Sequence, residues 1–279
     1  MIDNVAIILP IFDGYEDMWE DCIRLIKKNW KDHPPIYVFS NILQKDWEGV
    51  TCIPVGEDAE WSKKIQKAVE LVDKKYFILM LEDFFIGEIV KNDSIDELIT
   101  FMEKNRINFC KLCDNNNIIK KRKERFNSEY PYQVIFEDEE YGISLQTAIW
   151  EKNFLEKLVG RENYNAWQFE LNQVRIARTA NHVKMQNAIF DPRNILNIKH
   201  GALQGQLLPH TVKYFDNIGD PLNCQRVIMS RKTYLQYCIK QIGRDLTPKF
   251  AKKFVKSIAR HFGMIFVEDK WMTKDEKNI

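Results

Sequence analysis

The order of apolar and polar segments predicts an α/β protein in which helices flank a mixed, mostly parallel sheet. Short apolar runs alternate with amphipathic helical patterns through the first 115 residues, as in folds that pack helices on parallel strands. The run at 76–87, YFILMLEDFFIG, begins with five apolar residues among six and shows no alternation, which is typical of a strand buried on both faces. The 279 residues suffice for a domain of about 200–250 residues with an appendage, or for two domains.

The first four strands are predicted before residue 80. They are expected at 5–10, 36–39, 50–55 and from 76 onward. A helix over 18–30, capped by Asp17, and a second helix over 61–74 carry apolar residues at helical spacing. The short loops between these segments favour packing of both helices on one sheet.

The second half continues with the same two kinds of segment. Ser94 is expected to cap a helix, with Glu97 at the capping-box position. Further strands are predicted at 107–113, 132–136 and 144–150, and further helices through 159 and over 164–178. The polar stretch 114–129 is predicted to be a flexible loop, and the stretch 189–198 is predicted to have no regular secondary structure.

Composition excludes several classes of protein. The formal net charge is +1, from 41 basic and 40 acidic residues, which argues against a nucleic-acid partner bound by global charge. The first ten residues lack the basic region of a signal peptide, and no apolar run approaches the roughly 18 residues of a membrane span. The six cysteines are scattered, which favours free thiols in the cytoplasm.

The C-terminal part has a different pattern, so we expect a domain over 1–220 and a helical basic extension over 221–279. Between residues 246 and 264 there are five basic residues and no acid, and Phe250, Phe254 and Ile258 belong to one apolar stripe. This pattern predicts a basic amphipathic helix on the anionic inner face of the cell membrane. The alternative is a terminal helix that packs its stripe on the domain.

Two adjacent acids, Glu82 and Asp83, follow the strand at 76. Carboxylates are seldom fully buried unless they are paired or hold a metal, and the carboxyl end of a central strand opens into the ligand crevice of an α/β sheet. An acidic turn after a core strand is the plain alternative.

The ordered combination of motifs resembles GT-A glycosyltransferases, particularly bacterial enzymes that build capsule, lipopolysaccharide or exopolysaccharide. On the donor side it comprises a strand ending in proline, an Asp-containing turn, a strand ending in Ser-Asn, the segment GEDAEWS and then YFILMLEDFF. On the acceptor side SLQTAIW, NAWQFE and the glycine-punctuated HGALQG follow. The resemblance extends to about residue 215.

The resemblance implies a GT-A fold, a nucleotide-diphosphate donor such as a UDP-sugar, and Mn²⁺ or Mg²⁺ bound near the fourth strand. The usual Asp-x-Asp is altered here to Glu82-Asp83-Phe84, so Asp83 is expected as metal ligand, with Glu82 also as donor or metal ligand. Without a metal, Lys63, Lys64 or the basic run 120–123 could act instead. The positions matching the nucleobase and ribose pocket are Pro10, Asp13, Asn41, Asp58 and Trp61; capping and turn roles are the alternative for both aspartates.

The acceptor side of the resemblance supplies a candidate base. Glu170 lies between apolar residues that raise a carboxylate pKa, and it is predicted as general base of an inverting transfer, catalytic together with Asp83. Trp150 and Trp167 are expected to contact the acceptor, a glycan or polyprenyl-linked sugar. His200 is a further metal candidate, and His210 a metal or phosphate contact. The alternative for Glu170 is an ion pair with Arg175 or Arg178.

Two other functions remain open from the sequence. A nucleotidyltransferase shares this kind of sheet, although IFDGYEDMW lacks the glycine-rich loop and basic residue expected after the first strand. A catalytically silent glycan-binding or membrane scaffold is also compatible with the altered metal motif. A dinucleotide-dependent oxidoreductase is disfavoured because no GxGxxG follows a strand.

Overall fold

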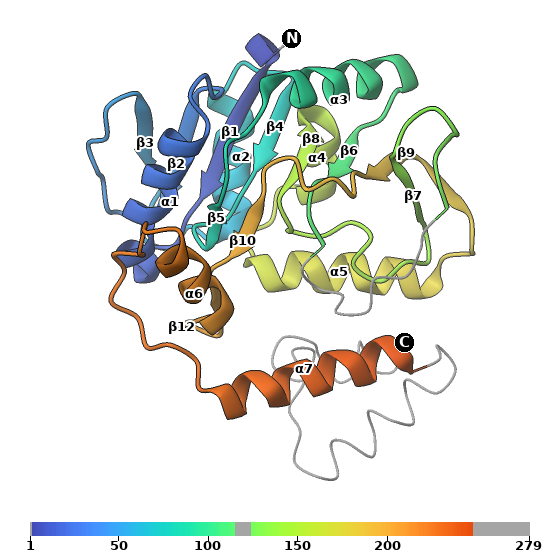
Figure 1. Cartoon of the computed structure of the whole chain (residues 1–279). Helices are drawn as coiled ribbons and strands as arrows, with labels where there is room; N and C mark the ends of the chain where they lie inside the picture. Colours follow the sequence, from blue (N-terminus) through green and yellow to red (C-terminus); the bar gives the residue numbers. More distant parts are fainter. Residues whose placement is uncertain (1, 115–123, 248–279) are drawn as a thin grey trace.

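The structure, a computed structural model, describes residues 2–114 and 124–247 and is built around an eight-stranded sheet (Figure 1). The strand order is β3-β2-β1-β4-β8-β6-β9-β7. Neighbours pair in parallel from β3 through β4 and between β6 and β9, whereas β8 and β7 run antiparallel to their neighbours. The predicted class, a mixed and mostly parallel sheet flanked by helices, is confirmed. The strands are β1 (Val5–Pro10), β2 (Ile36–Ser40), β3 (Val50–Pro54), β4 (Tyr76–Leu79), β6 (Phe109–Lys111), β7 (Gln133–Phe136), β8 (Ala148–Glu151) and β9 (Lys184–Phe190).

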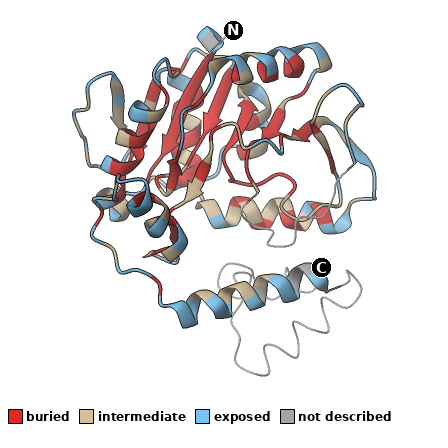
Figure 2. Ribbon diagram, in the orientation of Figure 1, coloured by how far each residue is buried: buried red, intermediate tan, exposed pale blue. Residues whose placement is uncertain are grey.

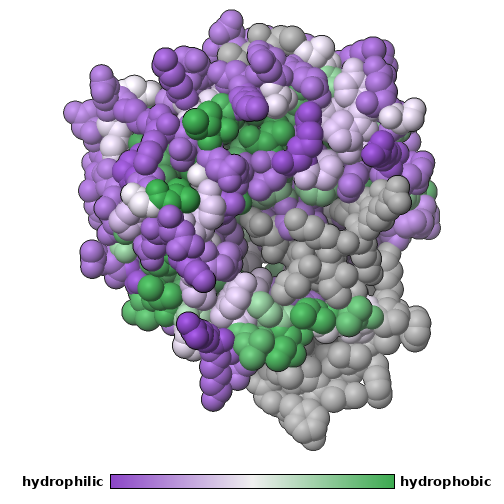
Figure 3. All heavy atoms as spheres, in the orientation of Figure 1, coloured by the Kyte–Doolittle hydropathy of each residue, from purple (hydrophilic) through white to green (hydrophobic). Residues whose placement is uncertain are grey.

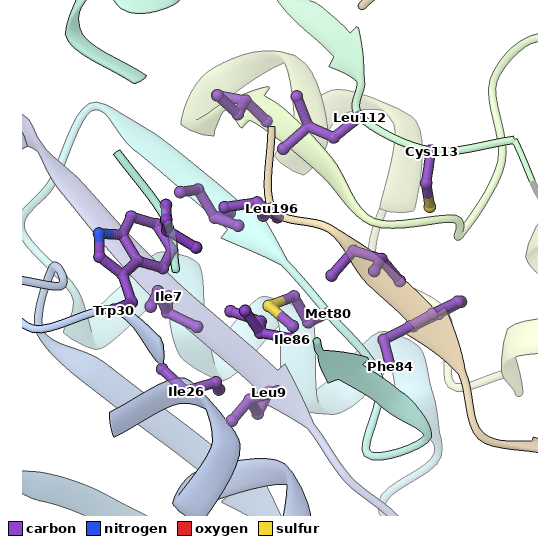
Figure 4. Close-up of a cluster of buried hydrophobic side chains, with 14 of the residues drawn as sticks. Ile7, Leu9, Ile26, Trp30, Met80, Phe84, Ile86, Leu112, Cys113 and Leu196 are labelled. Carbon is purple, nitrogen blue, oxygen red and sulfur yellow. The ribbon is translucent and has the colours of Figure 1, made fainter. Parts of the chain in front are cut away.

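Helices cover both faces of this sheet. On one face α1 (Glu16–Asn29) and α3 (Asn92–Asn105) pack on alternate residues of β1 and β4, and this core is drawn in Figure 4. On the other face α2 (Trp61–Leu71), α4 (Lys152–Val159) and α5 (Ala166–Thr179) enclose a second cluster. The central strands are therefore buried on both sides, as Figure 2 shows, which explains their unbroken apolar runs.

Small C-terminal elements fold back onto the sheet edge. β10 (Ile198–His200) pairs antiparallel with β5 (Phe84–Ile86), and β11 (Ala202–Leu203) pairs with β12 (Gln206–Leu207). α6 (Pro209–Asn217) and α7 (Arg231–Leu246) follow. No helix in the described ranges is both long and apolar enough to span a bilayer.

The segment 218–230 between α6 and α7 is held against α1. The fully buried carboxylate of Asp21 accepts hydrogen bonds from the backbone amides of Asn223 (2.7 Å) and Cys224 (3.0 Å). Arg226 forms a bidentate pair with Asp17. These contacts fix the chain on both sides of residue 224, while the boundary at 220/221 stays a prediction.

Three local expectations differ from the structure. The run 76–87 is two strands, because the chain turns at 80–83 and β5 leaves the main sheet to pair with β10. Asp17 lies inside the first turn of α1 and pairs with Arg226 instead of capping the helix. α3 begins at Asn92, so Ser94 is not its cap.

Candidate active site at the carboxyl ends of the strands

The candidate site lies at the edge where the parallel strands end. β1, β2, β3 and β4 are parallel, so their carboxyl ends meet there. β8 runs the other way, and its first residue, Ala148, lies opposite Leu79 at the end of β4. The loops after β1, β2, β3 and β4 therefore converge with the segment that leads into β8. Ligands of open α/β sheets bind at such an edge.

Asp13 ties the loop after β1 to the loop after β2. Its carboxylate accepts hydrogen bonds from three successive backbone amides, those of Asn41 (2.8 Å), Ile42 (2.9 Å) and Leu43 (2.9 Å). Such bonds satisfy amides that would otherwise be unpaired at a strand end. Asp13 thus shapes the edge, and its predicted contact with a donor stays a prediction.

Asn41 and Lys64 continue this network toward β3. The Asn41 amide donates to the carbonyls of Ala59 (2.8 Å) and Glu57 (3.1 Å), and its oxygen accepts from Lys64 Nζ at 2.8 Å. Lys64 Nζ also donates to the carbonyl of Ile11 at 2.6 Å and is buried. Burial lowers the pKa of Lys64, and the charge of Glu82 acts in the opposite direction. The three loops are therefore joined through one buried cation.

Phe12 and Ile42 lie beside this network, and the sequence alone did not identify them as site residues. Their side chains are 54% and 60% exposed, although both residues are apolar, and each lies two positions after the end of its strand, β1 or β2. Lys64 Nζ lies 5.9 Å from the centroid of the Phe12 ring. Large apolar side chains at the exposed mouth of a polar network suit a flat, partly apolar ligand.

The other predicted donor-side residues are placed in two different ways. Pro10 and Trp61 are buried, and the Trp61 ring packs on Phe169 with centroids 4.9 Å apart. Neither offers an open surface to a base, so the predicted contacts do not fit these two positions. Asp58 is exposed and borders an open pocket of about 330 Å³ together with Gly56, Glu57, Lys63 and Asn163.

Glu82 does not project into the open edge. It is 8% exposed and borders a small internal space with Leu9, Trp19 and Cys22. Burial raises the pKa of Glu82 to about 8, and the charge of Asp83 acts in the same direction. A buried carboxyl group with a raised pKa that lines an internal space beside α1 does not fit the predicted role of metal ligand.

The buried Glu82 predicts a pH-dependent stability. The folded chain keeps its proton up to a pKa of about 8, whereas the unfolded chain releases it near the ordinary value of 4.5. The free energy of unfolding should therefore fall as the pH rises through this window, because the folded state binds more protons. Between about pH 5.5 and 8 we expect Glu82→Gln to gain about 3 kcal/mol relative to the unsubstituted protein.

Urea unfolding at several pH values tests this expectation. Glu57→Gln, which changes an exposed glutamate of the same edge, should leave the pH dependence unchanged. Parallel stability curves for Glu82→Gln and the unsubstituted protein would mean that Glu82 is ionised in the folded state.

Asp83 and His200 form the polar pair that does lie at the edge. His200 Nε2 is 3.2 Å from Asp83 Oδ2, and both side chains are 20% exposed. The pair joins residues 117 positions apart in sequence, because β5 and β10 pair directly after Asp83 and up to His200. The His200 ring stacks on Phe84, with centroids 5.3 Å apart.

Gly201 allows β10 to lie close to β5 beside the Asp83–His200 pair. Its amide donates to the Asp83 carbonyl at 2.6 Å, and a Cβ at this position would lie 2.4 Å from the Phe85 ring. Any side chain would therefore push β10 away from β5. The carbonyl of His200 also accepts from Thr211 Oγ1 at 2.6 Å, so the backbone of His200 is fixed on both sides.

Asp83 and His200 fit a divalent cation as two protein ligands. A carboxylate oxygen suits Mn²⁺ or Mg²⁺, and diphosphate oxygens and waters can complete the shell of such ions. Over residues 2–114 and 124–247, no group of three or more His, Cys, Asp or Glu side chains converges on one point. The predicted trio is thus reduced to Asp83 and His200, since Glu82 faces inward.

His210 stands at the first turn of α6, near this pair. Partial burial lowers the pKa of His210, and the charges of His200 and Lys199 add to the effect. A neutral imidazole can bind a metal or donate to a phosphate. The predicted basic alternative at 120–123 lies outside the described residues.

Glu170 reaches the same edge from α5. The helix begins with a capping box between Asn165 and Gln168. Glu170 Oε1 accepts from the backbone amide of Leu145 at 3.0 Å, in the segment that leads into β8. Part of the residue is exposed, yet burial of the carboxylate raises the pKa of Glu170, while the Leu145 amide and the charge of Lys111 lower it. A raised pKa favours a general base near neutral pH.

The two predicted acceptor tryptophans differ in exposure. Trp167 is 48% exposed at the start of α5. Trp150 has no exposed surface and packs on Phe109, with centroids 4.4 Å apart. A contact between Trp150 and an acceptor sugar does not fit this placement, because its strand is central and covered on both faces.

Comparison with known proteins gives remote structural similarity. No protein-family model and no curated protein matches the sequence. Residues 1–349 of S. aureus TarS are similar at 10% identity and a TM-score of 0.43, covering 68% of this chain and 58% of that one. The same TarS segment in complex with UDP-GlcNAc gives 9% identity and 0.42, over 77% and 65%. A cytidylyltransferase from Leptospira borgpetersenii gives 13% and 0.35, over 57% and 66%.

This chain thus spans less than two thirds of the length of those TarS structures.

Proposed function

We propose that this protein is a glycosyltransferase that moves a sugar from a nucleotide diphosphate to a hydroxyl acceptor, with inversion at the sugar carbon. The observation that carries the proposal is the Asp83–His200 pair at the carboxyl end of β4. It places one carboxylate and one imidazole at the edge where α/β folds bind their ligands.

The donor would lie across the loops of this edge. The base would rest on the exposed Phe12 and Ile42, and the buried cation of Lys64 would add positive potential beneath it. Asp83 and His200 would hold Mn²⁺ or Mg²⁺ against the diphosphate. When bound, the metal supplies charge stabilisation of the leaving diphosphate. A UDP-sugar is the donor that we propose.

Glu170 would act on the acceptor. The acceptor oxygen forms its bond to the anomeric carbon while the bond from that carbon to the diphosphate oxygen breaks, and the electron pair leaves with the diphosphate. The hydroxyl proton passes to the Glu170 carboxylate. We propose a glycan or polyprenyl-linked acceptor of bacterial surface polysaccharide synthesis, with the protein in the cytoplasm at the inner face of the membrane.

Thermal unfolding with UDP, in the presence and absence of Mn²⁺, tests the donor site. A ligand at about a hundred times its Kd adds about 2.7 kcal/mol of stability, so a clear rise of Tm is expected, larger with Mn²⁺. His200→Asn should lose the Mn²⁺-dependent part of the rise. His182→Asn is the matched control, because His182 forms a similar pair with Asp138 away from the site.

The other functions give different results in the same assay. Stabilisation by a nucleoside triphosphate, followed by release of pyrophosphate, would indicate a nucleotidyltransferase. Binding of UDP-sugars with neither hydrolysis nor transfer would indicate a silent binding protein. If no nucleotide raises Tm, the donor site proposed here is wrong.

A further inference from the structure

One face of α7 presents apolar side chains to solvent. Leu235, Ile239, Ile242 and Leu246 are 60%, 60%, 36% and 65% exposed. Their spacing of i, i+4, i+7 and i+11 places them on a single stripe of the helix. Figure 3 shows green side chains gathered along α7, and Figure 2 shows much of the helix as exposed. We call these four residues the α7 stripe.

The first turn of α7 contacts the body of the protein. Tyr234, Tyr237 and Cys238 are partly buried, and the Tyr234 ring lies 5.5 Å from His210 of α6. The helix begins at a fixed point, since Ser230 Oγ accepts from the Thr233 amide at 3.1 Å. The stripe is therefore exposed on a helix whose first turn contacts α6, and a continuous apolar stripe of this kind marks an interaction surface.

Basic residues flank the stripe. Arg231 and Lys232 are exposed in the first turn of α7, and that turn contains no acid. The sequence after α7 adds five basic residues and no acid up to residue 264. A surface with an apolar stripe and a basic border complements the apolar interior and anionic headgroups of a lipid bilayer. A second copy of this chain would present the same basic residues and thus no complementary charge.

We propose that the α7 stripe binds the surface of an anionic lipid bilayer, with the helix parallel to the membrane and its leucine and isoleucine side chains below the headgroups. This places the lipid surface next to α6, whose Thr211 contacts His200. A lipid-linked acceptor would then reach the Asp83–His200 pair from the membrane. That consequence rests on the proposed function, whereas vesicle binding requires no turnover.

Sedimentation of the full-length protein with vesicles tests the surface. Vesicles containing about a third phosphatidylglycerol in phosphatidylcholine should bind the protein, and binding should weaken as salt is raised. Leu235→Ser with Ile239→Ser should lower the partition coefficient at least about tenfold, because two large apolar side chains leave the lipid. The matched control, Thr233→Ser with Gln236→Ser, changes exposed polar residues of the same helix and should bind normally.

Three results would overturn the proposal. The first is that the protein fails to bind anionic vesicles. The second is that the Leu235 and Ile239 variant binds as well as the control, which would mean that the residues after 247 carry the binding alone. The third is that the unsubstituted protein is a dimer and that this variant converts it to a monomer. Both variants should keep the Tm of the unsubstituted protein, since all four changed side chains are exposed. UDP binding, measured on the same samples, keeps a failure of this proposal separate from a failure of the proposed function.

Discussion

Asp83→Asn is expected to lower the rate of sugar transfer at least about a thousandfold and to leave the fold intact. Charge stabilisation of a leaving group by a bound metal is worth several kcal/mol, and each 1.36 kcal/mol is tenfold in rate. Asparagine keeps the shape of the side chain and loses the charge that would hold the cation. The carbonyl of residue 83 still accepts from the Gly201 amide, so β5 and β10 should stay paired.

Transfer rates measured over a range of Mn²⁺ concentrations distinguish a lost metal site from a distorted one. Asp73→Asn, an exposed aspartate before β4 at the opposite edge of the sheet, should behave as the unsubstituted protein. A variant that regains activity at high Mn²⁺ would retain a weakened site at His200. Near-normal turnover of Asp83→Asn at every concentration would rule out Asp83 as the centre of the reaction.

The first half of the sheet could be predicted because its strands are buried on both faces. β1 and β4 are fully buried, and a strand of this kind is a short apolar run that its length and flanking residues distinguish from a buried helix. β9 could not be predicted in the same way. Its residues alternate between exposed and partly buried at the start, and it becomes a strand by pairing with β6 and β7, contacts that only the folded chain provides.

The site was less accessible to sequence reasoning, because the exposure of a side chain depends on distant segments. Asp83 could be placed at the edge from its position after a strand. Glu82, its neighbour, turns inward toward Trp19 of α1, and no local pattern distinguishes the two acids. Trp150 and Trp167 are equally aromatic, yet β8 is covered by other elements and the start of α5 is open.

Glu170→Gln is expected to lower turnover by about 10²–10⁴-fold without weakening nucleotide binding, which is the usual contribution of a general base. The amide oxygen of glutamine can still accept from the Leu145 amide, a bond of 3.0 Å in this structure, so the loop before β8 should keep its position. Glutamine cannot take the acceptor proton. Single-turnover rates together with the Kd for UDP separate the two steps.

The pH dependence makes the test of Glu170 specific. Burial raises the pKa of this carboxylate above its ordinary range, and the base form is lost as the pH falls through the raised pKa. The rate of the unsubstituted protein should therefore decrease toward acidic pH, and Glu170→Gln should lack this decrease. Glu162→Gln, an exposed glutamate before α5, should retain it. A lower Tm with activity and pH profile preserved would show instead that Glu170 serves to hold the Leu145 amide, and the base must then be another residue.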